Sequence, residues 1–435
     1  MKAWIVTVDM GLGHQRAVYP LGDMAEGGLI TLGRPVDGLP QDREARLWRR
    51  LRGTYERVSR LLTVPLIGGP LFGLMDTLME IPPYYPRRDL SRPTFQVRLM
   101  RSFVDRGICQ SMLETVVGKP LPLITSYPAP AIAADAAGLN PVYCIVCDAE
   151  ISRAWVAADP AGSRIRYLAP CENAVKRLVS YGVPAKMITL TGFPFPAELT
   201  GGRDLGVLKN DLVGRLRRLD PAGRFRPLWG RHVADFLGLS RDAATRTKAE
   251  EPPSLTFAVG GAGAQREIGR GIACSLKEMI RDGRVRLNLV AGVRPEVHEY
   301  FQQVKAETAP ENGNLHILYH PDKTEYFRAF SALLRETDIL WTKPSELSFY
   351  AGLGLPVIMA PTIGCQETYN RRWLLQIQAG IDQEAPEYCA EWLPDLLASG
   401  RLAEAAWNGY LHVRQTGTFA IRDLLADGKA CLASA

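Results

Sequence analysis

Two glycine-rich segments in this sequence each follow an apolar run, and each could bind a ligand. The first segment, Asp9-Met-Gly-Leu-Gly-His-Gln-Arg-Ala, follows residues 3–8. Gly11 and Gly13 would let a substrate approach backbone N–H groups at a helix start, and His14 would face it. Because a histidine titrates near neutral pH, it can take a proton from a hydroxyl. We predict His14 as a general base, and packing of its ring at the helix start stays open as the alternative.

The second segment is Gly260-Gly-Ala-Gly-Ala-Gln265, which follows residues 254–259 and precedes an expected helix. Small residues and the positive end of a helix form a cradle for a diphosphate, here without the lysine of a P-loop. We therefore predict a diphosphate-binding loop made by Gly260, Gly261, Ala262, Gly263 and Gln265. A tight turn of a kind found in any doubly wound domain is the alternative.

Further polar residues follow apolar runs near the end of the second half of the chain. They are Ser345, Glu346, Gln366, Glu367 and Asn370. Carboxylates and amides provide the fixed acceptors and donors that sugar and ribose hydroxyls require. Taken singly, each of these residues could equally cap a helix or form a turn.

The apolar runs that must position these residues alternate with helical stretches. In the first half they are residues 3–8, 121–125, 142–146, 165–168 and 187–190, and in the second half 255–259, 287–291, 315–319, 338–341 and 357–360. Such alternation predicts an α/β protein with two doubly wound parallel sheets in series. We expect domains over residues 1–200 and 254–400, a linker or insertion over 201–253, and a helical tail over 401–435 that packs back across both.

The composition is that of a globular chain: 435 residues, 46% hydrophobic, 23% charged, with a formal charge of +6. The charge is too mild to indicate a nucleic-acid partner. No apolar run has the 18 or more residues of a membrane span, and residues 1–8 do not resemble a signal peptide. We expect a cytoplasmic protein, either free or at the inner face of a membrane. The eight cysteines suggest neither a disulfide framework nor a metal site, and Cys144 and Cys147 are expected to be buried.

Residues 41–63 carry seven Arg against three acids, with apolar residues at helical spacing, and lead into the apolar residues 64–75. This pattern is typical of a helix that lies in an anionic membrane interface and presents a lipid. A helix packed on its own domain, with Arg toward solvent, remains the alternative.

Taken together, these motifs resemble glycosyltransferase family 28, which holds the peptidoglycan N-acetylglucosaminyltransferase and the mono- and diglycosyldiacylglycerol synthases. The resemblance rests on the order of Gly-Leu-Gly-His14, Thr191-Gly-Phe-Pro194, Gly-Gly-Ala-Gly-Ala-Gln265, Lys-Pro-Ser-Glu346 and Gly-Cys-Gln-Glu367 with Asn370. The run from Cys147-Asp148 to Trp155 is also similar to the glycolipid synthases.

The resemblance implies a GT-B enzyme, with two Rossmann-like domains facing a cleft. The first domain would bind an acceptor, with Gly11, Gly13 and Ser126 on the acceptor side, and the second a UDP-sugar. His14, directly or through Asp148, would deprotonate the acceptor hydroxyl, while Glu346 would bind the ribose. An inverting transfer without metal or cofactor is expected, to a lipid or polyprenyl-linked acceptor. A UDP-sugar 2-epimerase, which shares this fold, and a non-catalytic nucleotide-sugar-binding protein stay open as alternatives.

Overall fold

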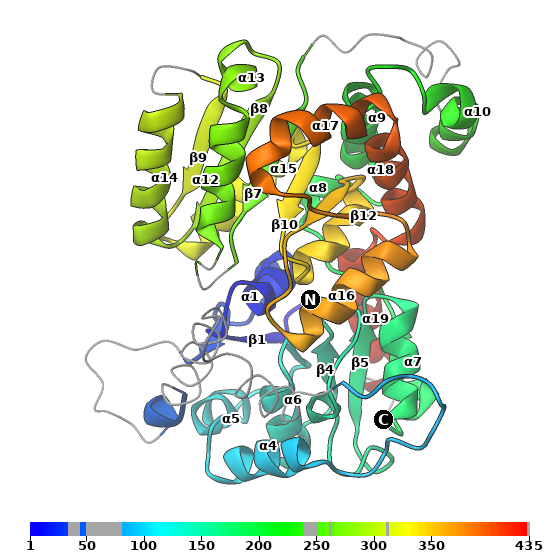
Figure 1. Ribbon diagram of the computed structural model, residues 1–435. Coiled ribbons are helices and arrows are strands. Elements are labelled where there is room, and N and C mark those ends of the chain that lie inside the picture. Colours follow the sequence, from blue (N-terminus) through cyan, green and yellow to red (C-terminus); the bar gives the residue numbers. More distant parts are fainter. Residues whose placement is uncertain are drawn as a thin grey trace. The chain divides into compact units, whose positions relative to one another are not determined.

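The computed structural model describes residues 1–33, 44–48, 81–238, 251–260, 263, 265–309 and 313–432. The chain forms two compact units. Unit 1 comprises Met1–Phe195, Ile363–Asn370 and Thr416–Ala435, and unit 2 comprises Pro196–Thr362 and Arg371–Gln415. Each unit contains one parallel sheet with helices packed against it (Figure 1).

Unit 1 contains a six-stranded parallel sheet with the order β2-β1-β3-β4-β5-β6. Its strands are β1 (Trp4–Val8), β2 (Ile30–Leu32), β3 (Leu123–Thr125), β4 (Val142–Ile145), β5 (Ile165–Ala169) and β6 (Ile188–Leu190). All residues of β1, β3 and β4 are buried. This is expected for strands covered by helices on both faces, and it explains why they read as apolar runs.

The helices of unit 1 come from three parts of the chain. They include α1 (Gly13–Val18), α4 (Phe95–Asp105), α5 (Gln110–Val116), α6 (Pro128–Ala136), α7 (Glu172–Ser180) and the C-terminal α19 (Gly417–Leu432). Thr418 Oγ1 of α19 donates to the Phe195 carbonyl over 2.5 Å, and Arg422 pairs with Asp23 at 2.7 Å. The tail is thus divided, since α18 (Arg401–His412) belongs to unit 2.

Unit 2 contains a second six-stranded parallel sheet with the order β12-β11-β10-β7-β8-β9. Its strands are β7 (Ser254–Ala258), β8 (Arg286–Gly292), β9 (Leu315–Tyr319), β10 (Ile339–Thr342), β11 (Val357–Met359) and β12 (Gly380–Asp382). Read from β9, the strands follow the dinucleotide-binding order 3-2-1-4-5-6. Helices α12 (Arg266–Ser275) and α14 (Pro295–Thr308) lie side by side on this sheet (Figure 1).

Each of the ten expected strands is present, with ends within two residues of those predicted. The prediction of two doubly wound α/β domains is therefore confirmed. The short strands β2 and β12, which lie at sheet edges, were not predicted.

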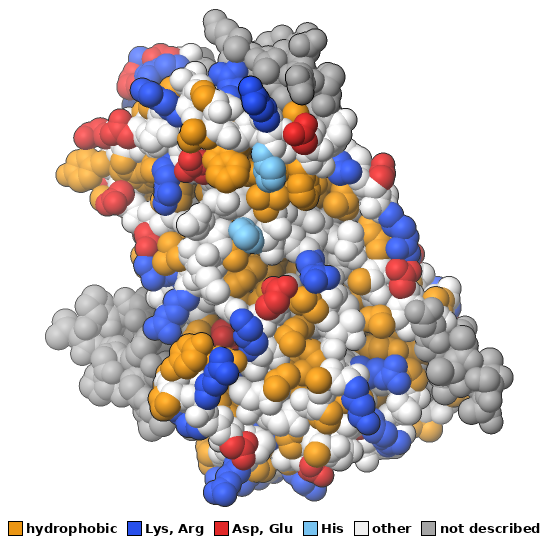
Figure 2. Space-filling model, turned by 90° about the vertical axis from the view of Figure 1, so that its right-hand side faces the viewer, with side chains coloured by type: hydrophobic (Ala, Val, Ile, Leu, Met, Phe, Trp, Pro, Cys, Tyr) orange, Lys and Arg blue, Asp and Glu red, His pale blue; other side chains and the backbone are white. Residues whose placement is uncertain are grey.

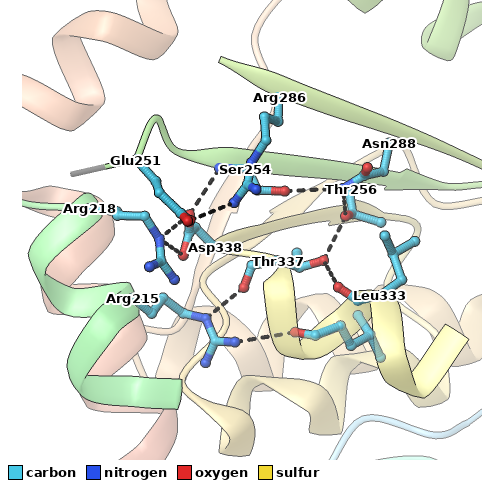
Figure 3. Close-up of polar contacts among 11 residues, drawn as sticks. Arg215, Arg218, Glu251, Ser254, Thr256, Arg286, Asn288, Leu333, Thr337 and Asp338 are labelled. Atoms are coloured by element: carbon cyan, nitrogen blue, oxygen red, sulfur yellow. Dashed lines mark hydrogen bonds and ion pairs between the residues drawn. The ribbon is translucent and has the colours of Figure 1, made fainter. Parts of the chain in front are cut away.

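The chain between the two sheets forms α8 (Ala197–Thr200), α9 (Gly206–Arg218) and α10 (Arg226–Leu237), and these helices belong to unit 2. Arg215 anchors α9 through the buried network of Figure 3. Its guanidinium donates to the carbonyls of Thr337, Leu334 and Leu353 over 2.7, 3.2 and 2.6 Å. Leu334 lies in the last turn of α15 (Lys323–Glu336) and Thr337 is its C-cap, so Arg215 joins α9 to the carboxyl end of this helix.

The same network continues along the amino ends of the strands. Arg218 Nε donates to Asp338 over 2.8 Å, and Asp338 also accepts the backbone N–H of Ser254 at 2.9 Å. Thr256 and Thr337 share a hydrogen bond of 2.7 Å (Figure 3). Because these polar groups are buried and bonded to one another, they stabilise the sheet and leave the opposite, carboxyl end for a ligand.

The surface mixes charged and apolar side chains. Figure 2 shows hydrophobic side chains dispersed among Lys, Arg, Asp and Glu on one face of the molecule. The exposed hydrophobic residues include Leu228 and Phe236 of α10. Among the described residues, no helix combines the length and the apolar character that crossing a bilayer requires.

Candidate functional site

The site in unit 1 lies at the carboxyl ends of β1 and β3. After β1 the chain turns to β2 on one side, and β3 lies on the other, so the connections reverse direction between β1 and β3. Ligands of open α/β sheets bind at such switch points. His14 follows β1, and Ser126 follows β3 directly.

His14 and Ser126 hold each other through two hydrogen bonds. The His14 Nδ1 donates to the Ser126 carbonyl over 2.7 Å, and the Ser126 hydroxyl donates to the His14 carbonyl over 2.8 Å. Thr7 of β1 completes the contact, since its hydroxyl lies 3.1 Å from the Ser126 Oγ. Ser126 and Thr7 are buried, so these bonds fix the imidazole against the ends of two strands.

The bond to a carbonyl determines the tautomer of His14. Because a carbonyl oxygen can only accept, Nδ1 carries the hydrogen, and the lone pair of the neutral ring is on Nε2. The ring also packs edge-on against Tyr127, with centroids 5.0 Å apart, and beside Trp155 at 6.1 Å. An oriented imidazole with a basic Nε2 is what a general base requires.

The turn that presents His14 depends on Gly11 and Gln15. Gly11 has a φ of +95°, which side-chain-bearing residues rarely adopt. The Gln15 amide donates to the Gly11 carbonyl over 3.0 Å and to Asp9 over 3.3 Å, which closes the turn. Gly13 begins α1.

Asp148 follows β4 and is bonded to Asn370, which the sequence placed among the donor-binding residues. Asn370 Nδ2 donates to Asp148 Oδ1 over 2.9 Å, and Asn370 Oδ1 accepts the Ala149 backbone N–H at 2.8 Å. Asn370 is fully buried, and the segment Ile363–Asn370 belongs to unit 1. The structure therefore gives Asn370 a role in positioning the loop after β4.

Glu367 and Gln366 lie in the first turn of α16 (Cys365–Gln376). The Glu367 carboxylate accepts the backbone N–H groups of Ile363 and Gly364, at 2.7 and 3.4 Å. It thus caps its own helix, as the alternative interpretation of this residue expected. Gln366 is half-buried.

A buried ion pair lies beyond Asp148 in the same loop. Glu150 accepts from Arg177 Nε over 2.5 Å, and the Arg177 side chain is fully buried. Burial raises the pKa of Glu150 more than the hydrogen bond from Arg177 lowers it. Arg177 also lies over the rings of Tyr84 and Tyr181. This pair was not predicted, because its members are separated in the sequence.

The site in unit 2 lies at the carboxyl ends of β7 and β10, where the connections of the second sheet reverse. The Gly263 N–H donates to the Gly260 carbonyl over 2.8 Å, and Gly263 has a φ of +72°. Gln265 precedes α12, and its amide donates to the Pro361 carbonyl over 2.8 Å. Of the loop predicted to bind a diphosphate, Gly261 and Ala262 lie outside the described residues.

Lys343, the first residue of the Lys-Pro-Ser-Glu346 motif, was not among the predicted site residues. It follows β10, and its side chain lies against Gly260: a Cβ at Gly260 would be 2.6 Å from Lys343 Cε and 3.4 Å from Nζ. The diphosphate loop was predicted to lack a P-loop lysine. The fold instead supplies a lysine from the neighbouring strand.

Ser345 and Glu346 begin the 3-10 helix η4 (Glu346–Leu353) and are half-buried. The Ser345 N–H donates to the Lys343 carbonyl over 2.8 Å, and the Ser345 carbonyl accepts the Ser348 N–H at 2.9 Å. Both residues therefore lie at the carboxyl end of β10, and binding of a ribose by Glu346 stays a prediction.

The thiols of Cys144 and Cys147 are buried in unit 1, as expected, and burial raises the pKa of Cys144. Within the described ranges, no cluster of His, Cys, Asp and Glu is suited to hold a metal ion.

Most of residues 41–63 lie outside the described residues, as do residues 64–75. At residues 44–48, a helical turn packs on unit 1: Trp48 Nε1 donates to the Ile108 carbonyl over 2.7 Å, and Glu44 accepts the Ser111 N–H at 2.9 Å. The contacts of these five residues fit the packed alternative, and the membrane-interface hypothesis for residues 41–63 stays a prediction.

Comparisons with known proteins agree with the architecture. A model of a domain of unknown function (DUF6938) matches residues 293–387. A search of curated proteins found no match. Among solved structures, a co-structure of S. aureus MnaA with UDP aligns with a TM-score of 0.50 at 11% identity, covering 100% of this chain and 97% of that one.

A putative UDP-N-acetylglucosamine 2-epimerase from Listeria monocytogenes aligns with a TM-score of 0.51 at 12% identity, covering 100% and 98% of the two chains. A structure of MurG from Acinetobacter baumannii aligns at 0.46 and 15% identity, covering 98% and 100%. Structural alignments at such low sequence identity show the fold alone. The resemblance to family 28 therefore remains a prediction. The chain has the GT-B fold, with two Rossmann-like domains.

Proposed function

We propose that the protein is a glycosyltransferase that binds a UDP-sugar through unit 2 and transfers its sugar to an acceptor hydroxyl bound by unit 1. The observation that carries this proposal is the fixed His14 imidazole, whose Nδ1 donates to the Ser126 carbonyl over 2.7 Å. The UDP-sugar is suggested by two proteins of the same fold, S. aureus MnaA in its co-structure with UDP and the putative UDP-N-acetylglucosamine 2-epimerase from Listeria monocytogenes.

In the proposed reaction, His14 Nε2 takes the proton of the acceptor hydroxyl. The acceptor oxygen attacks the anomeric carbon, a new C–O bond forms there, and the bond from that carbon to the diphosphate breaks with inversion. The electron pair of the broken bond leaves on UDP. General-base catalysis of this kind contributes about 10²–10⁴-fold to the rate.

Asp148 is proposed as the second residue of this centre, beside His14. Its Oδ1 accepts from Asn370 over 2.9 Å, which fixes the carboxylate at the end of β4. The end of β4 is next to that of β3, from which Ser126 comes, because β3 and β4 pair in the sheet. Asp148 would help to orient the acceptor or relay its proton.

A UDP-sugar 2-epimerase is the second candidate, because the Listeria monocytogenes protein of the same fold is a putative UDP-N-acetylglucosamine 2-epimerase. A panel of UDP-sugars distinguishes the candidates. An epimerase interconverts the donors without an acceptor, whereas a transferase releases UDP and does so faster when its acceptor is added. A non-catalytic binding protein leaves the UDP-sugars unchanged, and only its melting temperature rises. Interconversion of UDP-sugars without an acceptor would overturn the proposal of a transferase.

A lipid or polyprenyl-linked acceptor, met at the inner face of an anionic membrane, is the acceptor class that the family resemblance favours. The arginine-rich residues 41–63 would then bring the protein to anionic vesicles at low salt, and higher ionic strength would release it. Equal partition onto neutral and anionic vesicles would remove the argument for a lipid acceptor.

A further inference from the structure

We propose that the ammonium group of Lys343 binds the diphosphate of the nucleotide at the switch point of the second sheet. This inference rests on the proposed function, which supplies a nucleoside-diphosphate sugar as ligand. Lys343 follows β10, Gly260 follows β7, and these two strands pair in parallel from Ile339 and Leu255 to Thr342 and Ala258. Lys343 and Gly260 are therefore neighbours at the carboxyl ends of two central strands.

The charges at this edge favour an anion. Helix α12 begins at Arg266, six residues after Gly260, and the helix dipole is positive at its amino end. The Lys343 ammonium contributes a positive charge beside Gly260. A diphosphate placed there would be attracted by both, and the lysine would supply a point charge of the kind a P-loop lysine provides.

The stem of Lys343 lies in the space that a side chain at position 260 would occupy. Gly260 does not have a left-handed φ, so its backbone conformation would accept alanine. Its Cβ would be 2.6 Å from Lys343 Cε and 3.2 Å from Cδ, so an alanine would require the flexible lysine stem to move. The absence of a side chain at Gly260 therefore allows the end of the Lys343 side chain to lie beside this residue.

The proposal assigns Lys343 a part in the chemical step as well. When the bond between the anomeric carbon and the diphosphate breaks, its electron pair goes to a phosphate oxygen. A lysine already held at the diphosphate stabilises that added negative charge without reorganisation. In this account the lysine serves where other enzymes use a divalent cation.

Calorimetric titration with UDP, uridine and inorganic pyrophosphate tests the proposal. Lys343→Met keeps the apolar stem and removes the charge, so UDP and pyrophosphate should bind about 10- to 100-fold more weakly while uridine binds as before. Lys277→Met, on an exposed residue of α13 (Lys277–Arg281), is the matched control and should change none of these affinities. Unchanged UDP affinity in Lys343→Met, or an equal loss for uridine, would overturn the proposal.

Gly260→Ala provides a second, independent test. The new methyl group should displace the lysine, and so weaken UDP binding in the wild-type background but add little in a chain that already carries Lys343→Ala. If the losses of UDP affinity caused by Gly260→Ala and Lys343→Ala were fully additive, this would contradict a contact between the two residues. If the unmodified protein bound neither UDP nor pyrophosphate, the proposed function would fail together with this inference. If it bound UDP but transferred no sugar, only the proposed function would fail.

Discussion

At the scale of single residues, hydrogen bonds separate side chains that are fixed for chemistry from those that stabilise the fold. His14 is held through Nδ1, which leaves Nε2 as the basic atom of the neutral ring. Glu367 and Asn370 use their polar atoms on nearby backbone groups and on Asp148. Residue type alone would not distinguish these roles.

We predict that His14→Ala lowers turnover about 100-fold or more, because the general base is lost. The affinity for UDP and the melting temperature should be nearly unchanged, since UDP is assigned to the other unit. Steady-state kinetics and UDP titration measure both. Ser126→Ala is the control: it removes the hydroxyl bond of 2.8 Å but keeps the carbonyl that orients the ring, so its loss should be smaller. A folded His14→Ala protein with more than about a tenth of wild-type turnover would contradict the role.

Asn370 gives a prediction that depends on pH. Asn370→Asp would place a second carboxylate where the amide now donates to Asp148 over 2.9 Å. Two close carboxylates repel when both are ionised and share a proton at lower pH. The urea midpoint of this variant should fall below that of the wild type at pH 7.5, and the difference should shrink at pH 5. An equal difference at both pH values would show that charge repulsion is not the cause.

At the scale of elements, the sequence predicted the strands well because strands such as β1, β3 and β4 are buried on both faces and read as apolar runs. The edge strands β2 and β12 were not predicted, and each buries only one of its three residues. The contacts of Lys343 with Gly260 and of Asn370 with Asp148 join residues far apart in the chain. Such contacts follow from strand order, which spacing along the sequence does not give.

Helix α12 lies close to β7 and α14, and Gly269 permits this approach. A Cβ there would be 2.9 Å from both Phe257 Cδ1 and Phe301 Cε1. We predict that Gly269→Ala lowers the free energy of unfolding by about 1–3 kcal/mol through overpacking and weakens UDP binding.

Urea unfolding measures the first effect and calorimetry the second. The matched control is Gly230→Ala in α10, where the nearest atom to the new Cβ is Arg226 Cβ at 3.9 Å. That change should be neutral or stabilise the protein by up to about 1 kcal/mol, since alanine favours a helix. Equal effects of the two substitutions would contradict the packing argument.

At the scale of the whole molecule, each unit has one switch point at which the residues proposed for chemistry come together. In unit 1 it joins β1 and β3, and in unit 2 it joins β7 and β10. At the amino end of the second sheet, the residues of the polar network form hydrogen bonds with one another, and we propose no ligand there (Figure 3).

The proposed chemistry is also expected to be independent of metal. The leaving diphosphate would be stabilised by Lys343 and the α12 amino end, so turnover should survive EDTA. Loss of activity in EDTA that Mg²⁺ or Mn²⁺ restores would contradict this expectation. Stimulation of a few fold by a cation would not, because cations also assist release of a diphosphate.

The most direct test of the central claim, that unit 2 binds a nucleoside diphosphate at the carboxyl ends of β7 and β10, is amide hydrogen exchange with and without UDP. At 100 times its dissociation constant, UDP should suppress local opening by up to about 2.7 kcal/mol. The account predicts that this protection centres on peptides spanning residues 259–268 and 343–348. Protection confined to unit 1, or to the amino ends of these strands, or absent with every nucleoside diphosphate tested, would contradict it.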